Sequence, residues 1–174
     1  MNKCIFLDRD GVINRDRVDY AYDLSHFDML PGVAEALSRL KKAGYLLVVV
    51  TNQSGIAKGI YTREDMGTCH RYMHEHSDHV IDAVYYAPHH PVSTESLTRK
   101  PGSLMFEKAI ARFDIDPARS WMIGDKERDI TPAHKLGIPS ILISPERPKT
   151  KAQFIVENLS EATDRILELS AELS

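Results

Sequence analysis

The sequence predicts an α/β fold, a three-layer α/β/α sandwich built around a parallel, Rossmann-like sheet. Short apolar segments of strand length alternate along the whole chain with segments of helical periodicity. This alternation is the element order that a parallel sheet with right-handed crossovers requires. The segment Tyr45 to Val50 (YLLVVV) is apolar without interruption, as expected for a strand that helices cover on both faces.

Each expected strand is a short apolar run bounded by polar or turn-forming residues. The expected strands are residues 3–7, 45–50, 81–87, 120–124, 138–143 and 154–156. The first expected helix has apolar residues at helical spacing, the second begins with a weak N-cap signal at Thr62, and Pro31 and Pro101 are placed as helix-starting residues. The expected helices are residues 31–43, 62–75, 101–113, 127–136 and 160–173. Residues 10–30 have no steady period and are expected to form a loop.

The composition is that of one ordinary domain spanning residues 1–174, with 43% hydrophobic and 27% charged residues. A formal net charge of −3 gives no basic footprint for nucleic-acid binding. No apolar run approaches the roughly 18 residues of a membrane span, and the N-terminal run is too short for a secretory signal. The only cysteines, Cys4 and Cys69, are far apart in the sequence. We therefore expect a protein of the reducing cytoplasm.

Polar groups follow the first two expected strands at the edge where α/β sheets bind ligands. Asp8 and Asp10 follow the first strand, and Thr51 and Asn52 follow the second. Paired carboxylates suit metal binding and acid–base chemistry, and hydroxyl and amide groups suit phosphate oxygens. Taken singly, each segment is more typical of an ordinary solvated turn or strand-to-helix loop.

The next two expected strands are followed by charged groups. Arg99 and Lys100 close the loop after the third strand, and Asp125 follows the fourth, with Asp129 one helical turn further on. A surface basic pair and a helix-capping aspartate are the plain alternatives. Four successive strand ends nevertheless offer carboxylates, a hydroxyl, a cation and another carboxylate. This combination indicates a phosphoryl-transfer site that uses Mg²⁺.

The motifs that contain these residues resemble those of a known family. They are DRDGVIN (residues 8–14), TNQSGIAKG (51–59), RKP (99–101) and GDK (124–126). The set is similar to that of the haloacid dehalogenase superfamily of phosphohydrolases over nearly the whole chain. Within it, the motifs most resemble the subfamily of heptose bisphosphate and histidinol-phosphate phosphatases. The chain has no insertion large enough for a separate cap domain, so the resemblance implies an open site for a small phosphorylated metabolite.

The resemblance implies roles for the acidic residues. Asp8 is expected to be the nucleophile that forms an aspartyl-phosphate, and Asp10 the general acid and then the general base. Mg²⁺ would be bound by Asp8, Asp125 and the backbone carbonyl of Asp10. Asp129 would orient either Lys100 or the waters of the metal, with a purely structural salt bridge as the alternative.

The resemblance also implies the groups that bind substrate. Thr51, Asn52 and Lys100 are expected to bind the transferring phosphate. Arg99 and Lys126 match positions on the substrate side of the pocket, and the fork of a guanidinium suits a second phosphate.

One segment departs from the subfamily pattern. Many members bind a structural zinc ion in the loop after the third strand, through a Cys-x-His pair followed by a Cys-x-Cys pair. Residues 87–98 contain no cysteine here, so a sulfur-rich tetrahedral site cannot form. We expect no structural zinc, with His89 as either a relic of that pattern or a packing residue. Among the other histidines, His70 and His74 lie one helical turn apart, which is expected to reflect a solvated helix face, with a metal site as the alternative.

The expected activity is that of a Mg²⁺-dependent phosphomonoester hydrolase acting through an aspartyl-phosphate. The resemblance favours removal of the C7 phosphate of D-glycero-D-manno-heptose 1,7-bisphosphate by a monomer without nucleic-acid or membrane partners. Histidinol phosphate or another small sugar phosphate is the alternative substrate. A non-catalytic, receiver-like phosphoryl-binding module is the alternative of another class, but receivers place the acceptor aspartate after a middle strand rather than the first.

Overall fold

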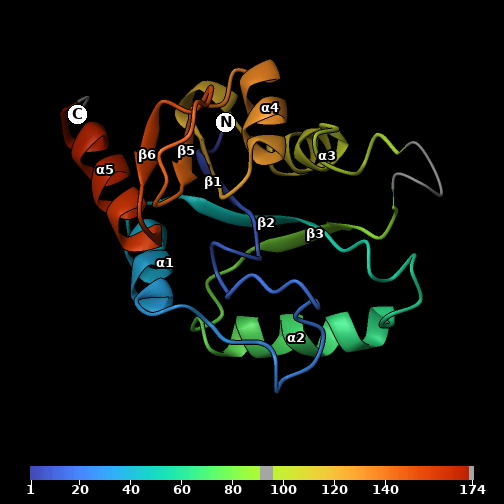
Figure 1. Cartoon of the computed structure of the whole chain (residues 1–174). Helices are drawn as coiled ribbons and strands as arrows, with labels where there is room; N and C mark the ends of the chain where they lie inside the picture. The colour runs from blue at the N-terminus through green and yellow to red at the C-terminus, as the bar shows by residue number, and fades with distance from the viewer. Residues whose placement is uncertain (91–95, 173–174) are drawn as a thin grey trace.

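The computed structural model describes residues 1–90 and 96–172 and contains one six-stranded parallel sheet in the order β3-β2-β1-β4-β5-β6 (Figure 1). The strands are β1 (Cys4–Leu7), β2 (Leu46–Asn52), β3 (Ala83–Ala87), β4 (Trp121–Gly124), β5 (Ser140–Ile143) and β6 (Phe154–Val156). All six expected strands are present. The predicted fold class is confirmed.

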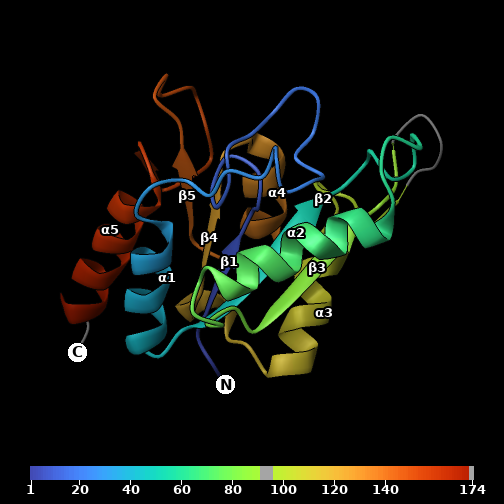
Figure 2. The ribbon, with the colours of Figure 1, turned by 90° about the horizontal axis from the view of Figure 1, so that it is seen from below.

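Helices cover both faces of the sheet, as Figures 1 and 2 show from two directions. One face carries α1 (Val33–Lys42), α2 (Arg63–Glu75) and α5 (Leu159–Glu172), and the other carries α3 (Leu104–Phe113) and α4 (Glu127–Lys135). A short 3₁₀ helix, Pro117–Arg119, precedes β4. No helix in the described residues is long and apolar enough to cross a membrane.

Strand β1 shows how the sequence supplies both layers of the core. Successive side chains of a strand point to opposite faces. Cys4 and Phe6 pack with α3 and α4, whereas Ile5 and Leu7 pack with α1, α2 and α5. All four are fully buried, which explains why this strand is apolar at every position.

Two predicted helix starts are wrong, both at a proline. α1 begins at Val33 instead of Pro31, because Gly32 between them has a φ of 77° that no right-handed helix contains. α3 begins at Leu104 instead of Pro101. The Gly102 amide donates to the Arg99 carbonyl at 2.7 Å, so the chain first closes a turn and only then enters the helix.

The strand order places a topological switch between β1 and β4. The chain runs from β1 outward through β2 and β3, and then returns to the other side of β1 to form β4, β5 and β6. The loops that follow β1 and β4 therefore leave in opposite directions and open a crevice at the carboxyl ends of these strands. Asp8 and Asp125 stand at the two sides of that crevice.

Candidate active site

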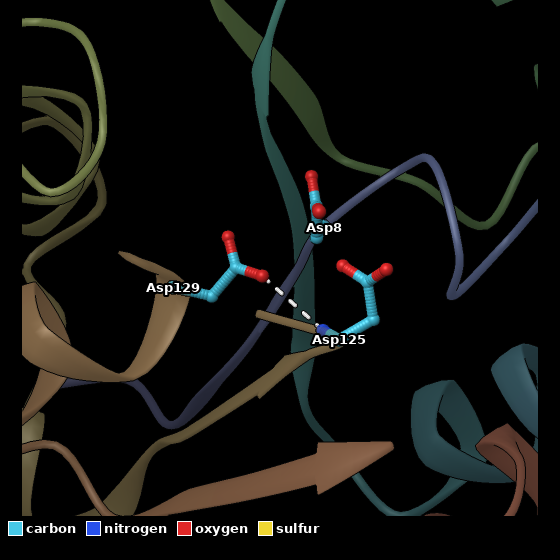
Figure 3. Close-up of side chains that lie close together, drawn as sticks. All are labelled: Asp8, Asp125 and Asp129. Atoms are coloured by element: carbon cyan, nitrogen blue, oxygen red, sulfur yellow. Dashed lines mark hydrogen bonds between the residues drawn. The ribbon is translucent and has the colours of Figure 1, made fainter. Parts of the chain in front are cut away.

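Three aspartates converge at the switch point (Figure 3). Asp8 continues the pairing of β1, because its amide donates to the Ile123 carbonyl of β4 at 3.0 Å. Asp125 directly follows β4, and Asp129 lies in the first turn of α4. One carboxylate oxygen from each lies within 4.8 Å of the others. The predicted convergence of Asp8 and Asp125 is confirmed.

Two glycines allow this convergence. A Cβ atom at Gly11 would overlap the Asp125 carboxylate, and a Cβ atom at Gly124 would overlap the side chain of Asp129. Gly11 also has a φ of 84°, which side-chain-bearing residues rarely adopt. Close approach therefore requires both glycines, and the positive φ favours glycine at position 11 in addition.

Lys100 is the cation at the centre of this cluster, and only 1% of its surface is exposed. Its Nζ lies 2.9 Å from Asp8 Oδ1 and 2.6 Å from Asp129 Oδ1. It also donates to the Val50 carbonyl at 2.7 Å. Burial disfavours the charged amine, but the two carboxylates outweigh burial and raise the pKa of Lys100. Lys100 is therefore a permanently charged group beside the expected nucleophile.

Asn52 fixes the backbone that carries this lysine. Its Nδ2 donates to the Lys100 carbonyl at 3.0 Å, and its Oδ1 accepts from the Lys100 amide at 2.9 Å. The sequence placed Asn52 among the phosphate-binding residues. In the structure its side-chain amide hydrogen-bonds the backbone of Lys100 on both sides. Asn52 would therefore contribute to phosphate binding indirectly, by holding Lys100 in place.

Asp129, in the first turn of α4, contacts both Lys100 and the turn that carries Asp125. Its Oδ2 accepts hydrogen bonds from the backbone amides of Asp125 at 3.2 Å and Lys126 at 3.1 Å (Figure 3). Its Oδ1 faces the Lys100 ammonium. Of the alternatives left open by the sequence, the geometry favours orientation of Lys100 together with the turn that holds Asp125.

The cluster has more negative charge than its cations offset. Burial, followed by the charge of Asp129, raises the pKa of Asp8 well above its usual range. The same two causes raise the pKa of Asp125, although Lys126 acts in the opposite direction. Asp125 Oδ1 is buried and has no hydrogen-bond partner in the described residues. Hard carboxylate oxygens, excess negative charge and an unpartnered oxygen all fit a divalent cation such as Mg²⁺.

Asp10 lies in a different electrostatic environment, although it is only two residues from Asp8. Its Oδ1 accepts from Arg9 Nη2 and from Asn14 Nδ2, each at 2.9 Å, and its Oδ2 accepts from Gln53 Nε2 at 3.2 Å. Burial would raise its pKa, but Arg9 and these hydrogen bonds outweigh burial and lower it. The pKa of Asp8 is thus raised and that of Asp10 lowered. Sites that assign different roles to two carboxyl groups separate their pKa values in the same way.

Arg9 is a buried residue of the candidate site that the sequence analysis missed. Its side chain is 99% buried, donates to the Ala21 carbonyl at 2.9 Å and lies with Nη1 3.3 Å from His70 Nε2. Its place between two aspartates in DRD was the available signal. An arginine next to an exposed turn gives the same pattern, so its burial could not be read from the sequence.

The expectation that His70 belongs to a solvated helix face is wrong. A guanidinium only donates hydrogen bonds, so His70 Nε2 must accept and the ring must be neutral. Burial and the charge of Arg9 lower the pKa of His70 to about 3. His74 instead pairs with His79, with ring centroids 4.7 Å apart, and His76 stacks on Tyr72. In residues 1–90 and 96–172, the aspartate cluster alone brings together three or more potential metal ligands.

The predicted substrate-binding residues lie at the rim. Lys126 Nζ lies 3.2 Å from Asp125 Oδ2 and 3.6 Å from Asp16 Oδ2, which joins the site to the loop after β1. Arg99 is partly buried and donates from Nη1 to the His89 carbonyl at 3.3 Å. A cavity of about 520 Å³ opens beside Asp125 and Lys126. Residues 91–95, which belong to the segment 87–98 that departs from the subfamily pattern, lie outside the described residues.

This fold and this site define a phosphohydrolase of the haloacid dehalogenase (HAD) type. A HAD-hydrolase-like family model matches residues 97–162, the part of the chain that contains Lys100, Asp125 and Asp129. The prediction of a phosphatase is confirmed over the receiver-like alternative. More narrowly, the chain belongs to the D-glycero-D-manno-heptose-1,7-bisphosphate 7-phosphatase family.

Two curated relatives and one solved structure carry this assignment. The D-glycero-beta-D-manno-heptose-1,7-bisphosphate 7-phosphatase of Haemophilus ducreyi is 40% identical over 78% of this chain and 79% of its own length. The enzyme of the same name from Escherichia coli O6:H1 is 38% identical over 97% of this chain and 90% of its own. The crystal structure of D,D-heptose 1.7-bisphosphate phosphatase from B. bronchiseptica, complexed with magnesium and phosphate, superposes with a TM-score of 0.88. It is 29% identical and covers 96% of this chain and 99% of its own.

The neutral, partly buried His70 predicts a loss of stability in acid. Its pKa is about 3 in the folded protein and about 6.5 in an unfolded chain. Between these values the unfolded state binds more protons, so stability falls as the pH drops, by about 2 kcal/mol at pH 5. His70→Gln keeps an acceptor for Arg9 and removes this titration. Urea unfolding at pH 7 and pH 5 should show a smaller acid loss in the variant than in the unchanged protein.

The matched control is His76→Gln, which changes an exposed histidine directly after the same helix. The control should keep the full acid loss. An equal acid loss in the His70→Gln variant would contradict a neutral His70.

Proposed function

We propose that this protein hydrolyses a phosphate monoester by transferring the phosphoryl group to Asp8. The observation that carries the proposal is the buried Asp8 carboxylate, fixed by Lys100 at 2.9 Å at the crevice between β1 and β4. Lys100 and the Thr51 hydroxyl would bind the phosphoryl oxygens, which offsets their charge as the transition state forms. Thr51 lies near the carboxyl end of β2, whereas Lys100 reaches Asp8 from the loop between β3 and α3.

In the first step a carboxylate oxygen of Asp8 attacks phosphorus, and the bond from phosphorus to the leaving oxygen breaks. Asp10 donates its proton to that leaving oxygen. Oδ2 is the oxygen that would carry the proton, because Arg9 and Asn14 both donate to Oδ1. A bound phosphate adds negative charge next to Asp10, which favours the protonated form that this step needs.

In the second step the same side chain acts as a base. Asp10 Oδ2 takes a proton from a water molecule, the water oxygen bonds to phosphorus, and the bond to Asp8 breaks. Inorganic phosphate leaves, with Asp8 ionised and Asp10 protonated as at the start. Two steps of modest difficulty replace one direct attack of water on an anionic ester.

Asp8, Asp125 and the backbone carbonyl of Asp10 are the groups that we propose for holding Mg²⁺. When bound, the ion would lower the repulsion between the anionic nucleophile and the anionic phosphate. The unpartnered Asp125 Oδ1 supports this arrangement.

As substrate we propose D-glycero-D-manno-heptose 1,7-bisphosphate, with loss of the C7 phosphate. The names of the relatives support this choice, as do two cations, Arg99 and Lys126, at the rim for a second phosphate. Histidinol phosphate, which has one phosphate, would offer those cations no second phosphate to bind. As part of the same proposal the enzyme acts in the cytoplasm as a monomer.

A panel of phosphate esters tests the substrate. We expect kcat/KM to be highest for the heptose bisphosphate and at least about tenfold lower for histidinol phosphate, the effect of about 1.4 kcal/mol of transition-state binding. Arg99→Ala should reduce this preference, because it removes a cation for the second phosphate. A higher kcat/KM for histidinol phosphate would overturn the choice of substrate.

Replacing Asp10 tests the mechanism. Asp10→Asn keeps the side-chain shape but removes the proton donor and acceptor, so turnover should fall by roughly 10²–10⁴-fold. The melting temperature should stay near that of the unchanged protein, which separates lost chemistry from lost folding. Turnover that persists in Asp10→Asn would refute the acid–base role of this residue.

The loop at residues 87–98 has no cysteine, and we propose that it holds no structural zinc. Elemental analysis of the purified, chelator-treated protein should find less than stoichiometric zinc, and Mg²⁺ alone should restore activity. Zinc that stays bound at one equivalent through chelation would contradict this proposal.

A further inference from the structure

Behind Asp10 lies a chain of hydrogen bonds that the proposed mechanism does not use. The Tyr61 hydroxyl donates to Gln53 Oε1 at 2.5 Å. Gln53 Nε2 then donates to Asp10 Oδ2 at 3.2 Å and to Thr51 Oγ1 at 2.9 Å. Gln53 and Tyr61 are buried, with 2% and 5% of their surfaces exposed. One amide group therefore touches both the proposed proton donor and a proposed phosphate-binding hydroxyl.

The orientation of the Gln53 amide decides whether it can support Asp10. A carboxylate accepts hydrogen bonds, so the amide nitrogen must face Asp10 and the amide oxygen must face away. In that orientation Oε1 receives the Tyr61 hydroxyl. Without this donor, Oε1 would be buried and unpartnered, which is costly. The amide could then recover a hydrogen bond by turning Oε1 toward the Thr51 hydroxyl, and Asp10 would lose its donor.

Gln53 also controls a part of Asp10 that its other neighbours do not reach. Arg9 and Asn14 donate to Oδ1, whereas within residues 1–90 and 96–172 Oδ2 accepts from Gln53 Nε2. The direction of Oδ2, the oxygen that exchanges the proton, therefore depends on this amide.

The Tyr61 ring is itself fixed from the opposite loop. Tyr22 stacks parallel to it, with ring centroids 5.3 Å apart and an interplanar angle of 3°, and Tyr20 packs at a tilt with centroids 5.8 Å away. Tyr20 and Tyr22 belong to the loop between β1 and α1, whereas Tyr61 directly precedes the cap of α2. The hydroxyl is thus placed by packing and not only by its hydrogen bond.

We propose that Tyr61 and Gln53 are positioning residues, in which the Tyr61 hydroxyl fixes the Gln53 amide and the amide aims Asp10 Oδ2 at the leaving oxygen. This inference rests on the proposed phosphatase mechanism and adds to it the residues that orient its general acid. Neither residue needs to touch substrate for this role.

The test uses Tyr61→Phe, which keeps the buried ring and removes only the hydroxyl. The substrates are phenyl phosphate and 4-nitrophenyl phosphate, since nitrophenolate leaves readily without a proton and phenolate depends more on a proton donor. For phenyl phosphate, kcat/KM should fall about tenfold, a fraction of the usual effect of a general acid. For 4-nitrophenyl phosphate it should fall less than about twofold, because kcat/KM reports the steps up to phosphoryl transfer.

A double-mutant cycle tests whether the hydroxyl acts through the amide. Gln53→Leu should show the same selective loss for phenyl phosphate, and adding Tyr61→Phe to it should cause little further change. Tyr22→Phe is the matched control, because it removes a hydroxyl from the adjacent stacked ring and leaves the Tyr61–Gln53 hydrogen bond in place. It should keep both kcat/KM values within about twofold of the unchanged enzyme.

Equal losses for both esters in Tyr61→Phe would overturn the inference, because they would show disturbed phosphate binding through Thr51 instead of disturbed proton transfer. Unchanged kinetics, or the same selective loss in Tyr22→Phe, would also overturn it. If the unchanged enzyme hydrolysed neither ester nor the heptose bisphosphate, the proposed function itself would fail, which is a result distinct from these.

Discussion

The buried ion cluster around Lys100 is the interaction on which the site and its framework both depend. An ammonium group removed from water costs several kcal/mol unless carboxylates and other acceptors surround it closely. Lys100 meets this requirement with Asp8 from the end of β1, Asp129 from α4 and the Val50 carbonyl from β2. The charge can therefore be buried only when segments remote in sequence have assembled. The same contacts place a fixed positive charge beside Asp8, the proposed nucleophile.

The two aspartates of the DRD segment show how a short stretch of chain can present two different acids. Asp8 is buried among other carboxylates, which raises its pKa, whereas Asp10 is paired with Arg9, which lowers its pKa. A cation near the first and a substrate phosphate near the second would move both groups toward the states that the proposed mechanism needs. The hydrogen bond from Arg9 in turn requires a neutral His70, which belongs to α2.

Much of the site could be predicted because parallel strands direct their carboxyl ends to one edge of the sheet. Asp8, Thr51 and Asp125 follow from locating apolar runs and examining the residue at or just past each end. The starts of α1 and α3 could not be placed from Pro31 and Pro101, because a proline suits a turn as well as the first turn of a helix. Residues that support the site from behind, such as Arg9 and Gln53, carry no periodic signal.

By itself the sequence determined the order of strands and helices, the chemical groups at the strand ends and the absence of cysteine from residues 87–98. These properties are local, because they depend on side-chain pattern and residue identity along the chain. Only the tertiary structure decided that the Asn52 side chain hydrogen-bonds the backbone of Lys100 and that His70 faces Arg9. Such pairings depend on how the strand-end loops and α2 fold back over the sheet, and hydrogen bonds between distant residues leave no pattern in the sequence.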